Sequence, residues 1–93
     1  MNWVYLLRCA DGTLYCGWTT DPAGRLKAHN SGTGAKYTRS RLPAELVYAE
    51  PCANRSEALR REAQIKRMRR EDKLKLIAKA GFPGPGTAFP DKE

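Results

Sequence analysis

Residues 3–19 read WVYLLRCADGTLYCGWT, and this stretch decides the fold. It contains two runs of mainly apolar and aromatic residues, 3–9 and 13–19, on either side of Ala10-Asp11-Gly12. Runs of this composition form strands, and a short connection containing Asp-Gly joins antiparallel neighbours. The stretch therefore predicts a β-hairpin.

The length of the hairpin loop decides which side chains meet. A two-residue type I′ turn at Asp11-Gly12 would place Tyr5 and Tyr15 on opposite faces of the sheet. A three-residue loop with Gly12 left-handed would place Tyr5 opposite Gly17 and both tyrosines on one face. Asp-Gly permits either turn. We predict the three-residue loop, because it alone brings the two phenols together beside a residue without a side chain.

The middle of the chain predicts a helix, a loop and a third strand. Asp21 and Pro22 favour the start of a helix that runs to about residue 31 and ends at Gly32. Residues 31–40 are polar and predict a loop, whereas residues 45–49 predict a strand.

Two further helices complete the pattern. Asn54, with Glu57 three residues later, favours the start of a helix that ends near residue 70, and a last helix covers about 71–80. The order β-β-α-β-α-α predicts an α+β fold (α/β in the broad sense), a small three-stranded antiparallel sheet flanked by helices. The predicted domain is 1–80, and the Gly/Pro-rich tail 81–93 is expected to be disordered. So small a core favours an open surface site over an enclosed cofactor.

The charge of the chain indicates a polyanionic partner. Seventeen Lys and Arg residues against ten Asp and Glu give a net charge of +7. Nine basic and four acidic residues lie between positions 55 and 75, so this stretch alone carries +5. A concentrated positive field favours nucleic acid, although a solvated helix face is the simpler alternative.

The cysteines and the hydropathy pattern favour a cytosolic protein. Cys9, Cys16 and Cys52 are odd in number and show no C-x-x-C spacing, so they predict neither a disulfide framework nor a zinc site. The sequence shows no signal-peptide pattern and no apolar run of about 18 residues. We therefore expect the protein in the cytoplasm, without a membrane span.

Glu62 is a carboxylate at a position where an apolar residue is expected. The helical period places it between Leu59 and Ile65, on the face that Ala58 also shares, so we expect its side chain to point inward. A buried carboxylate is paired, protonated or bound to a metal. One alternative is a structural ion pair with the cations at neighbouring angles, which are Arg55, Lys66 and Arg69.

Five side chains together satisfy the needs of phosphodiester hydrolysis: Tyr5, Tyr15, Arg25, His29 and Glu62. Arg25 and His29 are four apart and share a helix face. Glu62 can hold one divalent metal whose other ligands are water and phosphate oxygens, and Arg25 can bind a phosphate oxygen. The two phenols and His29 can order or deprotonate the attacking water. A phenol is a poor base near its ordinary pKa of about 10, so we expect neighbouring cations to lower it.

Trp3-Val4-Tyr5, followed by Tyr15-Cys16-Gly17, resembles the paired motifs of the GIY-YIG nuclease domain. The flanking strings HNSGTGAKYT, residues 29–38, and ALRREAQIK, residues 58–66, are also similar to it. The resemblance covers about residues 2–79. The strings look like those of the small stand-alone bacterial members, which are similar to the nuclease subunit of the eukaryotic branched-DNA resolving complex.

The resemblance implies a DNA endonuclease with one Mg²⁺ or Mn²⁺ ion, connected with DNA repair. It implies Glu62 as metal ligand, Arg25 as phosphate contact, and Tyr5 as general base or water-positioning phenol. It assigns Tyr15 and His29 assisting roles. Further nucleic-acid contacts are expected from Lys36, Tyr37, Arg39, Arg61 and Lys66.

We expect the substrate to be selected by structure rather than sequence, because so small a domain lacks an obvious groove-reading helix. The resemblance implies branched, flapped or single-stranded DNA as that substrate. Two alternatives stay open. The chain could be a non-catalytic nucleic-acid-binding module, or a nuclease subunit that depends on a protein partner for targeting.

Overall fold

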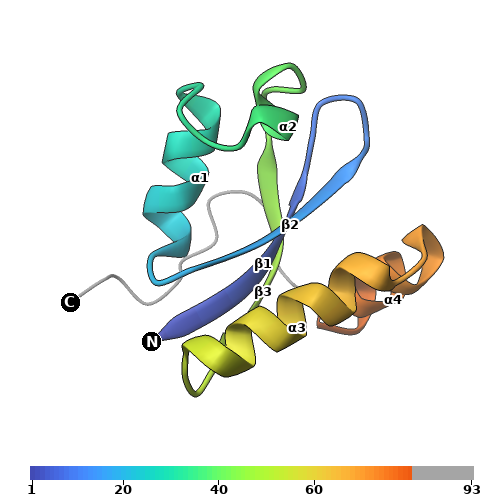
Figure 1. Cartoon of the computed structure of the whole chain (residues 1–93). Coiled ribbons are helices and arrows are strands. Elements are labelled where there is room, and N and C mark those ends of the chain that lie inside the picture. Colours follow the sequence, from blue (N-terminus) through green and yellow to red (C-terminus); the bar gives the residue numbers. More distant parts are fainter. Residues whose placement is uncertain (81–93) are drawn as a thin grey trace.

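A three-stranded antiparallel sheet lies at the centre of the computed structural model, which describes residues 1–80 (Figure 1). The strands are β1 (Asn2–Arg8), β2 (Leu14–Thr19) and β3 (Glu45–Cys52), in the spatial order β2-β1-β3. The predicted α+β fold is therefore confirmed. The tail predicted for 81–93 lies outside the described residues.

The three-residue hairpin loop is confirmed. The Cys9 amide donates to the Thr13 carbonyl at 2.8 Å, and Gly12 has a φ of 85°, in the left-handed region that favours glycine. This loop places Tyr5 opposite Gly17 on β2. Tyr15 therefore lies on the same face of the sheet as Tyr5.

Helices cover the two faces of the sheet separately (Figure 1). On one face lie α1 (Pro22–Asn30) and the one-turn α2 (Lys36–Arg39). On the other lie α3 (Arg55–Arg67) and α4 (Arg70–Ala80). Successive β1 side chains point to opposite faces, so this strand contributes to two separate cores.

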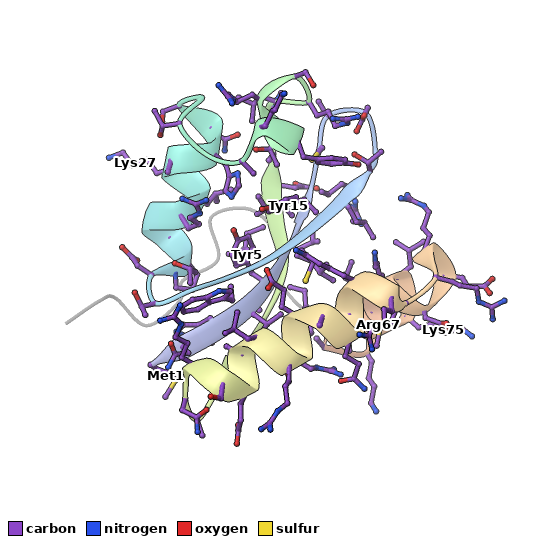
Figure 2. The ribbon with its side chains drawn as sticks, viewed as in Figure 1. Met1, Tyr5, Tyr15, Lys27, Arg67 and Lys75 are labelled. Atoms are coloured by element: carbon purple, nitrogen blue, oxygen red, sulfur yellow. The ribbon has the colours of Figure 1, made fainter. Side chains whose placement is uncertain are left out.

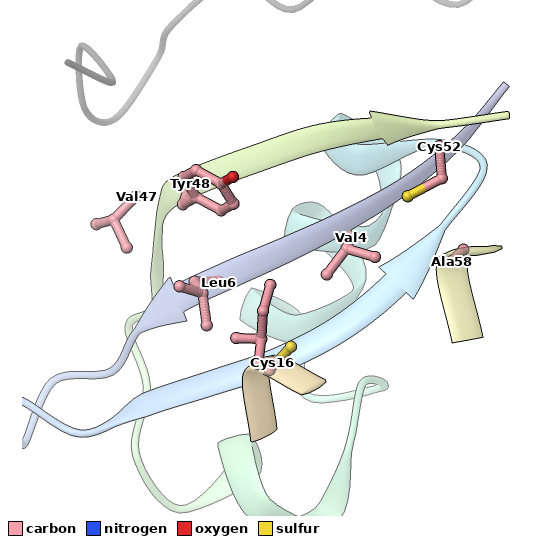
Figure 3. Packing of buried hydrophobic residues seen from close by; sticks show 8 residues of the cluster. Val4, Leu6, Cys16, Val47, Tyr48, Cys52 and Ala58 are labelled. Atoms are coloured by element: carbon pink, nitrogen blue, oxygen red, sulfur yellow. The ribbon is translucent and has the colours of Figure 1, made fainter. Parts of the chain in front are cut away.

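The larger core lies between the sheet and α3 (Figure 3). Val4 and Leu6 of β1 are completely buried there and pack with Cys16 of β2. Ala58 and Ile65 of α3 complete this core. All three cysteines are buried and free.

Predicted caps begin α1 and α3. Asp21 precedes α1, and its Oδ1 accepts from the Gly24 amide at 3.2 Å. Asn54 precedes α3 and accepts from the Glu57 amide at 2.9 Å, while the Glu57 carboxylate accepts from the Ala53 amide at 3.2 Å. The reciprocal contacts confirm the box-like signal at Asn54 and Glu57.

Three expectations about the elements need correction. The loop 31–40 contains a helical turn, α2, in which the Thr38 and Arg39 amides both donate to the Ala35 carbonyl. The third strand continues to Cys52 instead of ending at 49, because β3 is an edge strand and tolerates a proline within it. Leu59 is 41 % exposed, since it lies beyond the side of α3 that contacts the sheet.

No helix among residues 1–80 is both long enough and apolar enough to cross a membrane.

Candidate active site

The two phenols of the hairpin meet on the face of the sheet that α1 covers (Figure 2). The ring centroids of Tyr5 and Tyr15 are 6.4 Å apart. Tyr5 is almost completely buried, and its hydroxyl lies against the backbone of Gly17. A Cβ atom at Gly17 would lie 2.6 Å from the Tyr5 hydroxyl oxygen, so only glycine leaves room for the phenol.

His29 on α1 completes the buried group. Its Nε2 lies 3.1 Å from the Tyr5 hydroxyl oxygen, and its Nδ1 lies 2.8 Å from Oγ1 of Thr38. His29 and Thr38 are both completely buried. A side chain at Gly34 would collide with the imidazole, so this loop packs directly on the ring.

The hydrogen bonds assign the tautomer of His29. The Thr38 hydroxyl donates to the Ala35 carbonyl at 2.9 Å, and a hydroxyl has only one hydrogen to donate. Thr38 must therefore accept from Nδ1–H of His29. The other ring nitrogen, Nε2, is left as the acceptor for the Tyr5 hydroxyl. The result is a directed chain in which Tyr5 donates to His29, His29 to Thr38, and Thr38 to Ala35.

Tyr5 and His29, the two titratable members of this hydrogen-bond chain, are uncharged at neutral pH. Burial raises the pKa of Tyr5 to about 12, against the lowering effect of the Arg25 guanidinium beside it. Burial lowers the pKa of His29 below 6.5, and Arg25 adds to that shift. The expectation that cations lower the Tyr5 pKa is wrong for the free protein, because desolvation outweighs Arg25.

The α2 turn places exposed polar groups beside the buried hydrogen-bond chain. Lys36, Tyr37 and Arg39 are exposed on either side of buried Thr38. Tyr37 also reaches back to the site, since its ring stacks on that of Tyr15 with centroids 5.9 Å apart. Three of the predicted nucleic-acid contacts therefore lie on the turn that carries Thr38.

Glu62 does not join the phenol group. It lies on α3, across the sheet, where the Sγ of Cys16 contacts its backbone carbonyl at 3.9 Å. Its carboxylate is half-buried, with 18 % of the side-chain surface exposed, and its Oε2 lies 3.5 Å from Nζ of Lys66. Because Cys16 and Gly17 are neighbours on the edge strand β2, Glu62 and Tyr5 approach the same strand from opposite faces of the sheet.

The other two cations considered as partners of Glu62 have partners of their own. Arg55 lies over the Trp18 ring, and Arg69 pairs with Glu71 and Asp72. The ion-pair alternative for Glu62 is therefore realised through Lys66 only. Arg61 faces the β3 side of α3, where its Nε donates to the Glu50 carboxylate at 3.0 Å.

Sequence reasoning missed two residues that build the site. Thr38 fixes the imidazole, and Asn30 ties α1 to the start of β3, with its side chain accepting from the Ala44 amide at 2.7 Å and donating to the Ala44 carbonyl at 2.9 Å. Neither carries a signal of charge or periodicity. The string 29–38 that supports the resemblance includes both of them, and that is the one indication the sequence offers.

Residues 1–75 match the family model described as the GIY-YIG catalytic domain. The chain belongs to the GIY-YIG family. Its similarity to this nuclease domain implies a nuclease-type function with nucleic acid as substrate. In this member of the family, Tyr5 lies beside Tyr15 and its hydroxyl lies against Gly17.

Small bacterial GIY-YIG relatives align with most of the chain. A UPF0213 protein of Clostridium perfringens is 54 % identical over 78 residues, which cover 84 % of each sequence. A UPF0213 protein of Syntrophus aciditrophicus is 56 % identical over 77 residues, covering 82 % of this chain and 88 % of that protein. The solution structure of a UPF0213 protein from Bacillus halodurans superimposes with a TM-score of 0.58 at 45 % identity, covering 89 % of each chain.

Proposed function

We propose that this GIY-YIG protein is a divalent-metal-dependent endonuclease that hydrolyses DNA phosphodiester bonds and selects its substrate by structure. The proposal depends chiefly on the hydrogen-bond chain from Tyr5 through His29 to Thr38. A buried histidine with a defined acceptor nitrogen beside a phenol is equipped to move a proton, and hydrolysis begins with proton removal from water.

The chain of donors gives a proton-transfer route that needs no free phenolate. As the attacking water gives a proton to the Tyr5 hydroxyl oxygen, Tyr5 gives its own proton to Nε2 of His29. The water oxygen then bonds to phosphorus, and the bond to the leaving oxygen breaks. His29 becomes an imidazolium, which Thr38 stabilises at Nδ1. Because the Tyr5 pKa is raised to about 12, this concerted transfer is favoured over prior ionisation.

Arg25 is placed to bind the phosphate. It is half-buried on α1, one turn before His29, and its guanidinium acts directly on the Tyr5 phenol. A planar guanidinium binds phosphate oxygens in pairs and stabilises the negative charge that hydrolysis adds to them. Lys36 and Arg39 extend this positive surface outward over α2.

Glu62 fits a metal that the substrate helps to hold. Its half-buried carboxylate has one cationic partner, and that partner, Lys66, is itself more than half exposed. Residues 1–80 contain no group of three or more acidic, His or Cys side chains arranged for a metal. A single carboxylate with water and phosphate oxygens suits Mg²⁺ or Mn²⁺. When bound, such an ion supplies charge stabilisation at the phosphate.

A cleavage assay on labelled duplex, single-stranded, flapped and four-way DNA tests the proposal. The protein is incubated with Mg²⁺, Mn²⁺ or EDTA, and wild type is compared with Glu62→Ala and Tyr5→Phe. Glu71→Ala is the matched control, because it removes a carboxylate from an exposed position on α4. We expect metal-dependent cutting that both site variants lose by at least about a hundredfold and that the control keeps.

Two results would contradict the proposal. Equal activity of Glu62→Ala and wild type would remove the assigned role of the carboxylate. Tight DNA binding without cutting in either metal would favour a binding module, unless a cell-extract fraction restored cutting, which would indicate a partner-dependent subunit.

A further inference from the structure

Flat side chains form a column from the buried phenols to the protein surface. Tyr15 packs edge-on against His29, with ring centroids 5.3 Å apart. Tyr37 stacks on Tyr15 at an interplanar angle of 27°. The Arg41 guanidinium lies over the Tyr37 ring, with its Cζ 4.0 Å from the centroid. The column of Tyr15, Tyr37 and Arg41 therefore leads directly away from the Tyr5–His29 pair.

The outer end of the column is held in place before any ligand binds. Nε of Arg41 donates to Oδ2 of Asp11 at 3.0 Å, and its Nη1 donates to the Tyr37 carbonyl at 2.7 Å. The Ala10 amide donates to the Arg41 carbonyl at 2.8 Å, which joins the hairpin loop to the end of α2. Arg41 nevertheless keeps 33 % of its side-chain surface exposed. These hydrogen bonds therefore fix the orientation of the guanidinium plane, while part of the side chain stays exposed to solvent.

Tyr37 is an unusual residue to leave at the surface. Among residues 1–80 it is the only aromatic side chain in the set of exposed large hydrophobic residues, with 40 % exposure. Its sequence neighbourhood supplies the exposed cations Lys36 and Arg39, which suit a phosphate backbone. The outer face of the column, which is the Arg41 guanidinium backed by the Tyr37 ring and bordered by these cations, matches the two halves of a nucleotide, a base and a phosphate.

We propose that the Tyr15–Tyr37–Arg41 column is a stacking platform for an unpaired nucleobase next to the scissile phosphate. This inference rests on the proposed nuclease function and names its substrate class: strands that are unpaired at the cut, such as overhangs and flaps. Bases inside a duplex are already covered on both faces by their neighbours and cannot stack here without leaving the helix. Every base has a flat π face, so the platform selects unpaired structure without selecting sequence.

Base deletion tests the platform by binding alone. The probe is a labelled DNA duplex with a single-stranded overhang, in which one abasic residue is placed at successive positions from the junction. Affinity is measured in EDTA, so no cutting occurs. For wild type we expect one position at which base removal weakens binding about tenfold. For Tyr37→Ala we expect the intact probe to bind about tenfold more weakly and base removal at that position to have no further effect.

Matched variants separate stacking from charge and from folding. Tyr37→Phe keeps the ring and should keep the positional effect, whereas Arg41→Lys keeps the charge but loses the plane and should weaken it. Lys36→Ala should lower affinity for every probe equally, because it removes a phosphate contact. Thermal unfolding establishes that each variant is folded, and Arg41→Lys provides the test if Tyr37→Ala is not.

The outcomes distinguish this inference from the proposed function. Equal affinity for all abasic probes, or an abasic effect that persists in both Tyr37→Ala and Arg41→Lys, would overturn the platform while leaving metal-dependent cleavage untouched. A positional effect that depends on Tyr37 would support the platform even if the cleavage assay failed.

Discussion

At the scale of single residues, the site depends on small side chains that do no chemistry themselves. Gly17 and Gly34 leave the space that the phenol and the imidazole occupy. Thr38 decides which nitrogen of His29 carries the hydrogen. The reactive groups are therefore positioned by packing and by one hydroxyl. Of these three residues, Thr38 is the one whose role can be removed without changing the volume of the side chain.

Replacing Thr38 by Val should break the hydrogen-bond chain at His29. The variant keeps the shape but leaves the buried Nδ1–H of His29 without an acceptor, which costs about 1–3 kcal/mol of unfolding free energy. Because the hydrogen of His29 is then no longer held on Nδ1, the cleavage rate should also fall and its pH profile should shift. Urea unfolding and cleavage rates measured across pH check both effects. Thr38→Ser is the matched control, because it retains the hydroxyl, and equal behaviour of the two variants would contradict the hydrogen bond between His29 and Thr38.

At the scale of elements, patterns of two or three residues proved more reliable than the helical period. The Asp-Gly loop, the Asp21 cap and the Asn54–Glu57 box are local chemistry, and all three were confirmed. The exposure of Leu59 and the formation of the α2 turn depend on which surfaces meet in three dimensions. No local sequence pattern encodes such contacts, so the expected inward face at Leu59 and the expected loop at 31–40 were wrong.

The candidate site shows the same limit. The pairing of Tyr5, Tyr15 and His29 followed from the hairpin register and from the resemblance. The contribution of Thr38 did not, because a hydroxyl in a polar loop has no pattern of its own. Glu62 was correctly placed on an inward-turned side of α3, but the sheet separates it from the phenols, and only the tertiary structure shows this.

The close approach of α3 to the sheet depends on Ala58. This side chain of α3 is completely buried in the core that also contains Val4 and Cys52, so Ala58→Leu should force the helix outward and cost about 1–3 kcal/mol of unfolding free energy. Ala63→Leu, at an exposed position of the same helix, is the control and should cost less than about 0.5 kcal/mol. Denaturant unfolding of both variants gives the comparison, and similar losses would disprove the packing argument.

At the scale of the whole molecule, one side chain controls how stability responds to mild acid. His29 is the only histidine in the chain. Its pKa is lowered in the folded protein by burial and by Arg25, so the unfolded chain takes up a proton first as the pH falls. Stability must therefore rise with pH between the lowered native pKa and the ordinary value near 6.5.

The free energy of unfolding should increase through that window by up to about 1.4 kcal/mol per pH unit in wild type. In His29→Gln the slope should be nearly flat until carboxylates titrate at lower pH. The terminal amine is present in both proteins and cancels in the comparison. Urea titrations at closely spaced pH values provide the measurement. Parallel curves for the two proteins would show that His29 is not desolvated in the folded state.

The hydrogen of Thr38 points to a backbone carbonyl, and a carbonyl has no proton to hand on. The hydrogen-bond chain that starts at Tyr5 therefore ends inside the protein and does not conduct protons to bulk water. A proton that His29 accepts during hydrolysis can leave only through the phenol by which it entered. In the proposed reaction, that return path delivers it to the departing oxygen or to solvent water at the site. One histidine can then serve as base and acid within a single turnover, and the enzyme is reset without exchanging protons through its core.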